Sequence, residues 1–466
     1  MFPFFSQPNL SIQTTMSAPG GTLARTIPRR RIASKSLAKN PASRKALGSA
    51  GDKPKIALAM AGGGPLGAMY EIGVLMALDE SLDGLDLNDM DIYVGVSAGS
   101  FITAGLANQF SPSEIYRMFI DNTGNGKAAA RNGALTPELF LKPAWREFTG
   151  RLKRVPGLAL KGLVRRVASP FRRTTLEAFA PLARAIPAGL FDNEGIARYL
   201  QKMFSQPGRT DDFRKLKRTL YSVAVDLDTG RAVTFGALGH DHVPISKAVQ
   251  ASSALPGLFP PVEIGGHHYV DGALIKTLHA SLALEDGAAL VIGVNPLVPY
   301  DADAANRRAG SRSKADMEKL VDGGLPVVLS QTFRTLIHSR MHTGFEKYAA
   351  KYKDASIVLF EPAGDDPEMF FTNLFSYASR RRVCEHAYQR TRADLLKRRF
   401  ELEPIFAKFG IRLNLDALKD EHRTLDSRMF AQQQPSRDQR LSDATVDLGD
   451  AIGELERWIA RSHPAS

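Results

Sequence analysis

The sequence predicts an α/β fold with a mainly parallel central sheet. Residues 56–61 and 91–96 are short, mostly apolar runs typical of buried strands, and each leads through a glycine-containing turn into a helical pattern of apolar residues. Strands that alternate with helices in this way usually pair in parallel. With 466 residues, 44% of them hydrophobic, the chain is long enough for one large α/β domain with appendages.

The apolar patterns also give the order of the elements along the chain. Strands are expected at 56–61, 91–96, 219–226, 232–236, 289–295 and 356–360. Helices are expected at 68–80, after residue 97, at 113–122, 246–254 and 326–351, and after residue 380. The two strands at 219–226 and 232–236 are expected to form a hairpin around a turn that ends in glycine.

Three parts of the chain differ in composition. Residues 1–52 are rich in Ser, Pro, Thr, Ala and Arg without apolar periodicity, which predicts a disordered basic tail. Residues 53–400 form the predicted catalytic domain, which is interrupted by a basic, helical insertion at about 127–190. Residues 401–466 are a charged C-terminal extension, with a polar tail that is also expected to be disordered and one short amphipathic stretch at 446–460.

The net charge of +12 is concentrated in two segments. Residues 1–51 and 151–173 each contain eight Lys or Arg and no acidic residue, and the rest of the chain is close to neutral. Local basicity indicates an anionic surface as partner rather than nucleic acid, because no aromatic residues that could stack on bases are interleaved with the basic ones. The segment 151–173 is also amphipathic, which is typical of a membrane contact or a lid, and equally of a solvated helix packed on the domain.

The sequence contains no recognised signal peptide or membrane-spanning segment. No apolar run approaches the roughly 18 residues that span a bilayer, and no apolar stretch follows the basic run at 29–31 as a secretion signal would require. The acid-free N-terminus also resembles an organellar transit peptide. The single cysteine, Cys384, allows no internal disulfide, and Cys/His spacing of the metal-binding type is absent. We therefore expect a cytoplasmic protein without a metal or cofactor.

Ser97 is the candidate nucleophile. It stands in Gly95-Val96-Ser97-Ala98-Gly99, where a predicted strand turns directly into a helix. Such a turn strains the backbone of the residue at the bend and exposes its side chain at the helix N-terminus. The glycines on either side are needed because a Cβ there would collide with neighbouring elements. The alternative interpretation is an ordinary tight turn in a buried α/β unit.

The run Gly62-Gly63-Gly64-Pro65-Leu66-Gly67 follows the first strand. Its spacing matches a dinucleotide-binding turn, but the second strand does not end on the acidic residue that would hold the ribose. No Gly-Lys-Ser/Thr follows, so a nucleoside-triphosphate loop is excluded as well. We therefore expect the N–H groups of the four glycines to form an oxyanion hole. Loops that follow neighbouring parallel strands open at the same edge, which places these donors beside Ser97.

The residues alone leave the general base open. Asp271 follows a short apolar strand in an Asp-Gly turn, where its carboxylate can face a pocket, and partial burial would raise its pKa into a usable range. A Ser-His-Asp triad would instead need a histidine from a late loop. The candidates for that role are His240, His242, His267 and His268.

Four motifs together resemble the patatin-like phospholipases over about residues 54–300. They are the glycine run, the serine elbow, Ala251-Ser252-Ser253-Ala254-Leu255-Pro256, and Asp271-Gly272-Ala273, in the order of that family. The resemblance implies a three-layer α/β/α fold and a dyad of Ser97 and Asp271 without a histidine. One position departs from the family, which usually has Arg or Lys where this chain has Leu66.

The predicted function is that of a serine lipid acyl hydrolase, which cleaves ester-linked fatty acids from phospholipids or other lipids through an acyl-enzyme. One alternative is a catalytically silent lipid-binding or membrane-binding protein on the same fold, which Leu66 would favour. Another is a lipid acyltransferase, in which an alcohol replaces water. The expected partners are a lipid substrate and an anionic membrane surface with which the protein associates peripherally. The acyl position and the oligomeric state do not follow from the sequence.

Overall fold

The computed structural model describes residues 53–120, 142–145, 149–150, 187–309, 320–371, 377–425 and 427. All of these lie in the second of two units into which the chain divides, Met1–Gly48 and Ser49–Ser466. The predictions for the N-terminal tail, for most of the insertion including its basic segment 151–173, and for the polar C-terminal tail concern residues outside the described ranges.

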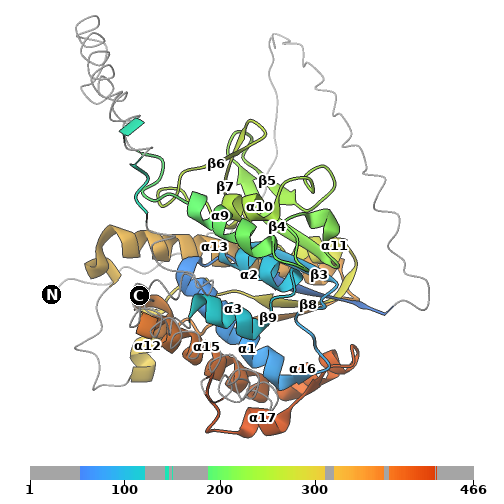
Figure 1. The fold of residues 1–466 in the computed structure, drawn as a ribbon. Coiled ribbons are helices and arrows are strands. Elements are labelled where there is room, and N and C mark those ends of the chain that lie inside the picture. Colours follow the sequence, from blue (N-terminus) through green and yellow to red (C-terminus); the bar gives the residue numbers. More distant parts are fainter. Residues whose placement is uncertain are drawn as a thin grey trace, which may run out of the picture. The chain divides into compact units, whose positions relative to one another are not determined.

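An eight-stranded sheet forms the centre of the domain (Figure 1). Its strand order is β6-β7-β4-β3-β1-β8-β9, and β5 pairs with β4. The strands are β1 Lys55–Met60, β3 Ile92–Val96, β4 Thr219–Asp226, β5 Arg231–Phe235, β6 Val262–Ile264, β7 His267–Asp271, β8 Ala288–Val294 and β9 Ser356–Phe360. The five strands β4, β3, β1, β8 and β9 run parallel, which confirms the predicted mainly parallel sheet. Outside this sheet, β2 (Leu82–Asp83) pairs with β10 (Arg412–Leu413).

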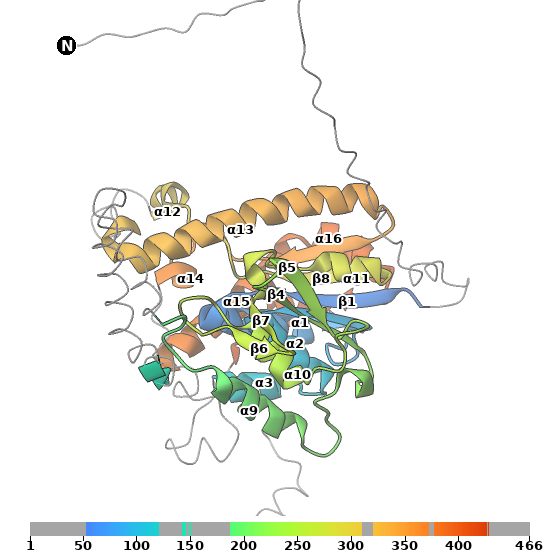
Figure 2. The same cartoon turned by 90° about the horizontal axis from the view of Figure 1, so that it is seen from above.

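Helices cover both faces of the sheet, so the expected three layers are present (Figures 1 and 2). Side chains alternate between the faces of a strand. On β1, Leu58 and Met60 join a core cluster with α1, α2 and α15, whereas Ala57 and Ala59 join a second cluster with α11 and α13. The helices are α1 Gly64–Ser81, α2 Ala98–Ala107, α3 Pro112–Phe119, α9 Glu194–Phe204, α10 Ile245–Ser252, α11 Ala280–Glu285, α12 Ala302–Ala309, α13 Gly324–Lys351, α14 Glu368–Phe371, α15 Tyr377–Lys397, α16 Arg399–Ala407 and α17 Leu415–Lys419.

Strand β4 changes its partner at the position where β3 ends. It pairs with β3 as far as Val223 and with β7 from Ala224 onward, along one edge, because β5 occupies its other edge. Val96, the last residue of β3, lies opposite Val223, and Asp271, the last residue of β7, lies opposite Ala224. This register brings the end of antiparallel β7 directly to the end of β3.

Helix α1 begins earlier than the sequence pattern indicates. It starts at Gly64, not near Ala68, with a proline in its first turn. Proline is tolerated there because the missing N–H would have no acceptor within the helix. Gly64 has a φ of +59°, in the left-handed region that favours glycine. The glycine run is therefore short as a loop and passes at once into the helix.

Candidate active site

Ser97 lies at the junction between β3 and α2, where the backbone is strained. Its φ of 53° and ψ of −122° are rarely adopted by a residue with a side chain. The space around the turn requires glycine, since a Cβ on Gly99 would lie 2.6 Å from the carbonyl oxygen of Ala61. Ser97 is only 6% exposed. A strained serine between a strand and a helix N-terminus has the geometry of a nucleophile elbow.

A second serine holds this elbow to the neighbouring strand. The Ser97 N–H donates to Ser252 Oγ at 2.8 Å, and the Ser252 hydroxyl donates to the Val223 carbonyl at 2.6 Å. Ser252 is the last residue of α10 and is fully buried. One hydroxyl thus connects the strained turn with β4. The sequence contains Ser252 in a recognisable motif, but its pattern gives no indication of this role.

Asp271 stands beside the Ser97 hydroxyl at the end of β7. The Ser97 side chain is close enough to the Asp271 carboxylate to lower its pKa, and the carboxylate accepts the Ala273 N–H at 2.8 Å. The backbone N–H of Asp271 donates to the Ala254 carbonyl at 3.0 Å. Asp271 is 3% exposed, and this burial raises its pKa to about 6, although Ser97 and the Ala273 N–H act in the opposite direction. A carboxylate of this kind can accept a proton near neutral pH.

The glycine loop after β1 lies against Ser97. A Cβ placed on Gly62 would be 3.0 Å from Ser97 Cβ and 3.7 Å from its Oγ. The Gly62 N–H donates to the Thr277 carbonyl at 3.4 Å, and the Gly67 N–H donates to the Gly63 carbonyl at 2.9 Å. Gly63 and Gly64 are the N-cap and first residue of α1, where N–H groups have no acceptor within the helix.

The positive ends of two helices meet at this loop. Strands β1 and β3 are parallel neighbours, with Met60 opposite Gly95, so α1 and α2 begin side by side. Each N-terminus carries a partial positive charge that favours a nearby anion. The arrangement suits stabilisation of negative charge that develops next to Ser97 Oγ. Leu66, at the position of the family's cation, is buried in the core cluster under α1.

The histidines named as triad candidates on β7 pair with acidic residues of the neighbouring hairpin. His267 Nδ1 lies 3.2 Å from Asp226 Oδ2, and His268 Nδ1 lies 3.4 Å from Asp228 Oδ2. Asp226, Asp228 and His267 also have potential metal-ligand atoms within 4.8 Å of one another. The ion pairs and the turn hydrogen bonds of Asp226 to the backbone of Asp228 and Thr229 account for this group.

The other histidines are arranged differently. His240 and His242 follow β5, and the His240 carbonyl accepts the Gly236 N–H. His279, which the sequence patterns do not single out, is buried just behind the Asp271 turn. Burial lowers the pKa of its ring to about 3, and the nearby backbone of Lys276 and Gly272 opposes this shift only in part. His279 is therefore neutral and supports the turn that carries Asp271.

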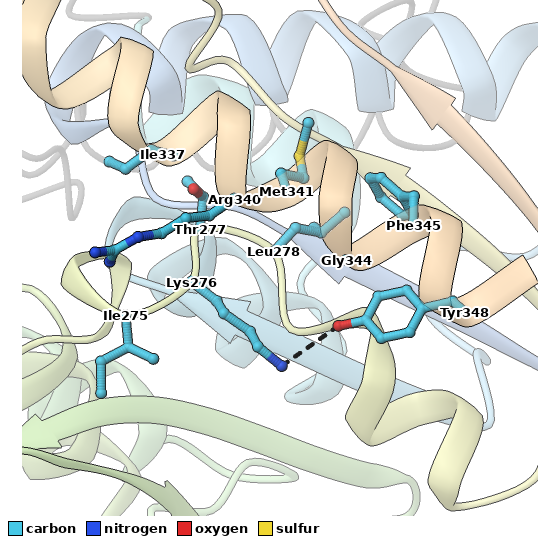
Figure 3. A pocket seen from close by; sticks show the side chains of 10 residues that line it. All are labelled: Ile275, Lys276, Thr277, Leu278, Ile337, Arg340, Met341, Gly344, Phe345 and Tyr348. Atoms are coloured by element: carbon cyan, nitrogen blue, oxygen red, sulfur yellow. Dashed lines mark hydrogen bonds between the residues drawn. The ribbon is translucent and has the colours of Figure 1, made fainter. Parts of the chain in front are cut away.

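A small cavity lies behind the glycine loop, between α13 and residues 275–278 (Figure 3). Apolar side chains of both segments line it, among them Leu278, Met341 and Phe345. Lys276 Nζ donates to the Tyr348 hydroxyl at 3.4 Å along its side. The Thr277 carbonyl joins this segment to Gly62, so α13 supports the glycine loop through residues 275–278.

Comparison with protein-family models matches residues 58–284 to the patatin-like phospholipases. The match contains the glycine loop, the serine elbow and Asp271. Residues 58–284 belong to the patatin-like phospholipase family. This patatin-like domain is thereby placed in a family of lipid-ester hydrolases.

Curated relatives match a shorter stretch of the chain. Uncharacterized NTE family proteins of Mycobacterium tuberculosis and Mycobacterium bovis are 38% identical over 80 residues, which is 17% of this chain and 13% of each relative. The match thus spans a minor part of those proteins.

Solved structures similar to the chain include VipD from Legionella pneumophila and ExoU from Pseudomonas aeruginosa in complex with SpcU. VipD has a TM-score of 0.32 and 17% identity, over 73% of this chain and 66% of VipD. ExoU has a TM-score of 0.21 and 19% identity, over 45% of this chain and 39% of ExoU. Likeness at this level is too weak to support an inference about function.

Proposed function

We propose that the patatin-like domain hydrolyses ester-linked fatty acids of lipids, with Ser97 as nucleophile and Asp271 as general base. The observation that carries this proposal is the register of β4, which brings the buried Asp271 at the end of β7 to the strained turn that carries Ser97. An ester carbonyl that reaches Ser97 Oγ would meet a nucleophile, a base and helix N-termini in one place.

In the first half of the reaction, Ser97 Oγ attacks the ester carbonyl carbon and its proton passes to the Asp271 carboxylate. The tetrahedral intermediate then collapses, and the C–O bond to the alcohol breaks as Asp271 returns the proton to the leaving oxygen. This leaves the fatty acyl group on Ser97. In the second half, Asp271 takes a proton from water, the hydroxide attacks the acyl-enzyme, and the fatty acid leaves as Ser97 regains its proton.

The oxyanion of both tetrahedral intermediates is assigned to the glycine loop. Gly63 and Gly64 are the preferred donors, because Gly62 and Gly67 already donate to carbonyls of the protein. The dipoles of α1 and α2 add to the field of these N–H groups. Removal of a single such donor typically reduces kcat by 10²–10³-fold in other hydrolases.

The same dyad requires Asp271 to be ionised in the free enzyme. Its raised pKa of about 6 makes it a stronger base than an ordinary carboxylate while it stays ionised above that pH. We also expect peripheral association with anionic membranes, as the basic segments of the sequence indicate. None of the helices in the described ranges has an apolar stretch long enough to cross a bilayer.

A fluorophosphonate probe tests the nucleophile, and a panel of phospholipids and neutral lipid esters read by mass spectrometry tests the reaction. The wild-type protein should be labelled and should release fatty acid, and Ser97→Ala should do neither. Ser253→Ala is the matched control, since no side-chain hydrogen bond joins Ser253 to Ser97 among the described residues, and it should behave like the wild type. Equal labelling of the wild type and Ser97→Ala would refute the nucleophile. Transfer of the acyl group to an added alcohol without fatty acid release would replace hydrolysis by acyl transfer.

A further inference from the structure

Large hydrophobic side chains are exposed next to the segment that holds Asp271. Trp145, which is 68% exposed, Leu190 and Leu255 lie on three segments joined by backbone hydrogen bonds. The Ala144 N–H donates to the Leu190 carbonyl at 3.0 Å, and the Leu190 N–H donates to the Leu258 carbonyl at 3.0 Å. Residue 254, directly before Leu255, accepts the backbone N–H of Asp271. This first apolar group therefore borders the base of the dyad.

A second apolar group is exposed on the N-terminal half of α13. Its members share one side of the helix and are Val328, Leu329, Phe333 and Leu336. Gln331 Oε1 accepts the Tyr300 N–H at 3.0 Å, and Gln331 Nε2 donates to the Tyr300 carbonyl at 2.8 Å. Arg334 Nη1 donates to the Val298 carbonyl at 3.1 Å. Residues 298 and 300 follow the carboxyl end of β8. The second group thus lies at the edge of the sheet on which the glycine loop opens.

The exposed apolar residues are confined to that half of α13. The helix runs back along the sheet and ends at Lys351, just before β9 starts at the opposite, amino edge (Figure 2). In the second half no large hydrophobic side chain of the described residues is exposed, and most exposed side chains there are polar or charged, among them Arg340, Glu346 and Lys347. The first half also exposes Ser330, Thr332 and Thr335, so what distinguishes it is the added large apolar side chains.

The two groups flank the candidate active site along the sheet edge. Ser97 follows β3 and the glycine loop follows β1, the two central strands. The first group lies on the side of β4 and β7, and the second lies beyond β8. We call the Trp145, Leu190, Leu255 group and the α13 group together the carboxyl-edge face. Soluble proteins rarely expose large apolar surfaces unless these surfaces bind something.

We propose that the carboxyl-edge face docks on a lipid bilayer, so that ester bonds reach Ser97 from the plane of the membrane. This inference rests on the proposed lipid substrate, since apolar groups on both sides of a catalytic serine suit a substrate that is itself part of an apolar layer. Charge favours the same partner. Lys142 is exposed on the same segment as Trp145, and its ammonium group would face the anionic head groups of a bilayer.

Tryptophan fluorescence tests the proposal residue by residue, because the chain has only two tryptophans, Trp145 and Trp458. Three reporters are made in a Ser97→Ala background that cannot turn over lipid. The first keeps Trp145 and carries Trp458→Phe. The second and third carry both Trp→Phe changes with either Leu336→Trp on the face or Leu238→Trp as control. Leu238 is exposed on the turn after β5, near the amino edge of β4.

Each reporter is mixed with vesicles of phosphatidylcholine that contain phosphatidylglycerol, and with vesicles that carry brominated acyl chains. We expect a blue shift and bromine quenching for the Trp145 and Leu336→Trp reporters, and neither for Leu238→Trp. Vesicle binding without a shift in the first two reporters would overturn the proposal, as would an equal shift in all three. A shift that appears without vesicles as protein concentration rises, together with dimers in gel filtration, would assign the face to a second copy of the chain.

Failure of this inference can be told apart from failure of the proposed function. A soluble short-chain ester needs no bilayer, so wild-type protein should hydrolyse it whether or not the face docks. The double variant Trp145→Ser, Leu336→Ser should keep this activity and its probe labelling but lose most hydrolysis of vesicle lipid. If the variant still hydrolyses vesicle lipid at the wild-type rate, the proposed docking face is wrong. If the wild-type protein hydrolyses neither the soluble ester nor vesicle lipid, the proposed function itself is contradicted.

Discussion

Replacing Ser252 by alanine removes the hydroxyl that joins the serine elbow to β4. In the wild type this oxygen accepts the Ser97 N–H at 2.8 Å and donates to the Val223 carbonyl at 2.6 Å. Both groups are deeply buried, and alanine offers neither an acceptor nor a donor. The strained backbone of Ser97, with φ at 53°, would then lose a contact that fixes it.

The expected loss of stability follows from the two unmet groups. A buried N–H or C=O without a partner costs about 1–3 kcal/mol, so the loss of both partners should lower the free energy of unfolding by roughly 2–6 kcal/mol. The effect on catalysis is separate. If the elbow moves, Ser97 Oγ loses its alignment with Asp271, and a displacement of about 1 Å can reduce a rate by 10²-fold. We expect fluorophosphonate labelling of folded Ser252→Ala to slow by about 10- to 100-fold.

Urea unfolding followed by circular dichroism measures the free energy of unfolding. The rate of labelling by the fluorophosphonate probe, from samples quenched at successive times, measures the reactivity of Ser97. Ser253→Ala is the control, because it is the adjacent residue and its Oγ does not bind the elbow. Both variants are compared below the unfolding transition, so that the labelling rate refers to folded protein. Wild-type stability together with wild-type labelling in Ser252→Ala would refute the assigned role of the Ser252 hydroxyl.

Four further experiments probe the dyad and the elbow. With a soluble ester, kcat/KM should rise with pH and reach half its maximum near pH 6, the pKa of Asp271; a midpoint below pH 4.5 would contradict a buried base. Asp271→Asn should be inactive yet, by urea unfolding at pH 8, at least as stable as the wild type: the raised pKa means that wild-type stability falls as pH rises from about 4 through 6 and stays lowered above it. His267→Ala and His268→Ala, alone or together, should retain most activity, because their rings pair with the hairpin; if the folded double variant is as inactive as Asp271→Asn, the base is a histidine. Gly99→Ala should destabilise the domain by about 3 kcal/mol in the same unfolding assay, since its Cβ would meet the Ala61 carbonyl, and unchanged stability would contradict the close packing.

The sequence was informative where the determinants are local. The Gly95 and Gly99 spacing around Ser97 predicts a strained turn between strand and helix, and both the turn and the positive φ are found. The sequence pattern predicts the start of α1 too late, because glycine and proline weaken a helical pattern although a proline fits the first turn.

Contacts between segments that are far apart in the chain could not be predicted from the sequence. Nothing in residues 91–97 or 267–271 shows that β7 continues the pairing of β4 where β3 stops, which is what brings Asp271 to Ser97. The hydroxyl of Ser252 and the ring of His279 act on backbone groups that only the folded chain places beside them. The exposure of large apolar side chains on the first half of α13 is visible only once the inner face of the helix is known.

Because β4 pairs first with β3 and then with β7, this one strand fixes the position of the nucleophile relative to the base. Ser97 follows β3 and Asp271 ends β7, and these two strands run in opposite directions. Each of the two residues is positioned by a different stretch of β4. A slip of one residue in either pairing would turn a side chain to the other face of the sheet and separate the dyad. The proposed hydrolysis therefore requires both pairings of β4 to be in register at once. A variant that shifts either pairing would lose the dyad even if the rest of the sheet formed.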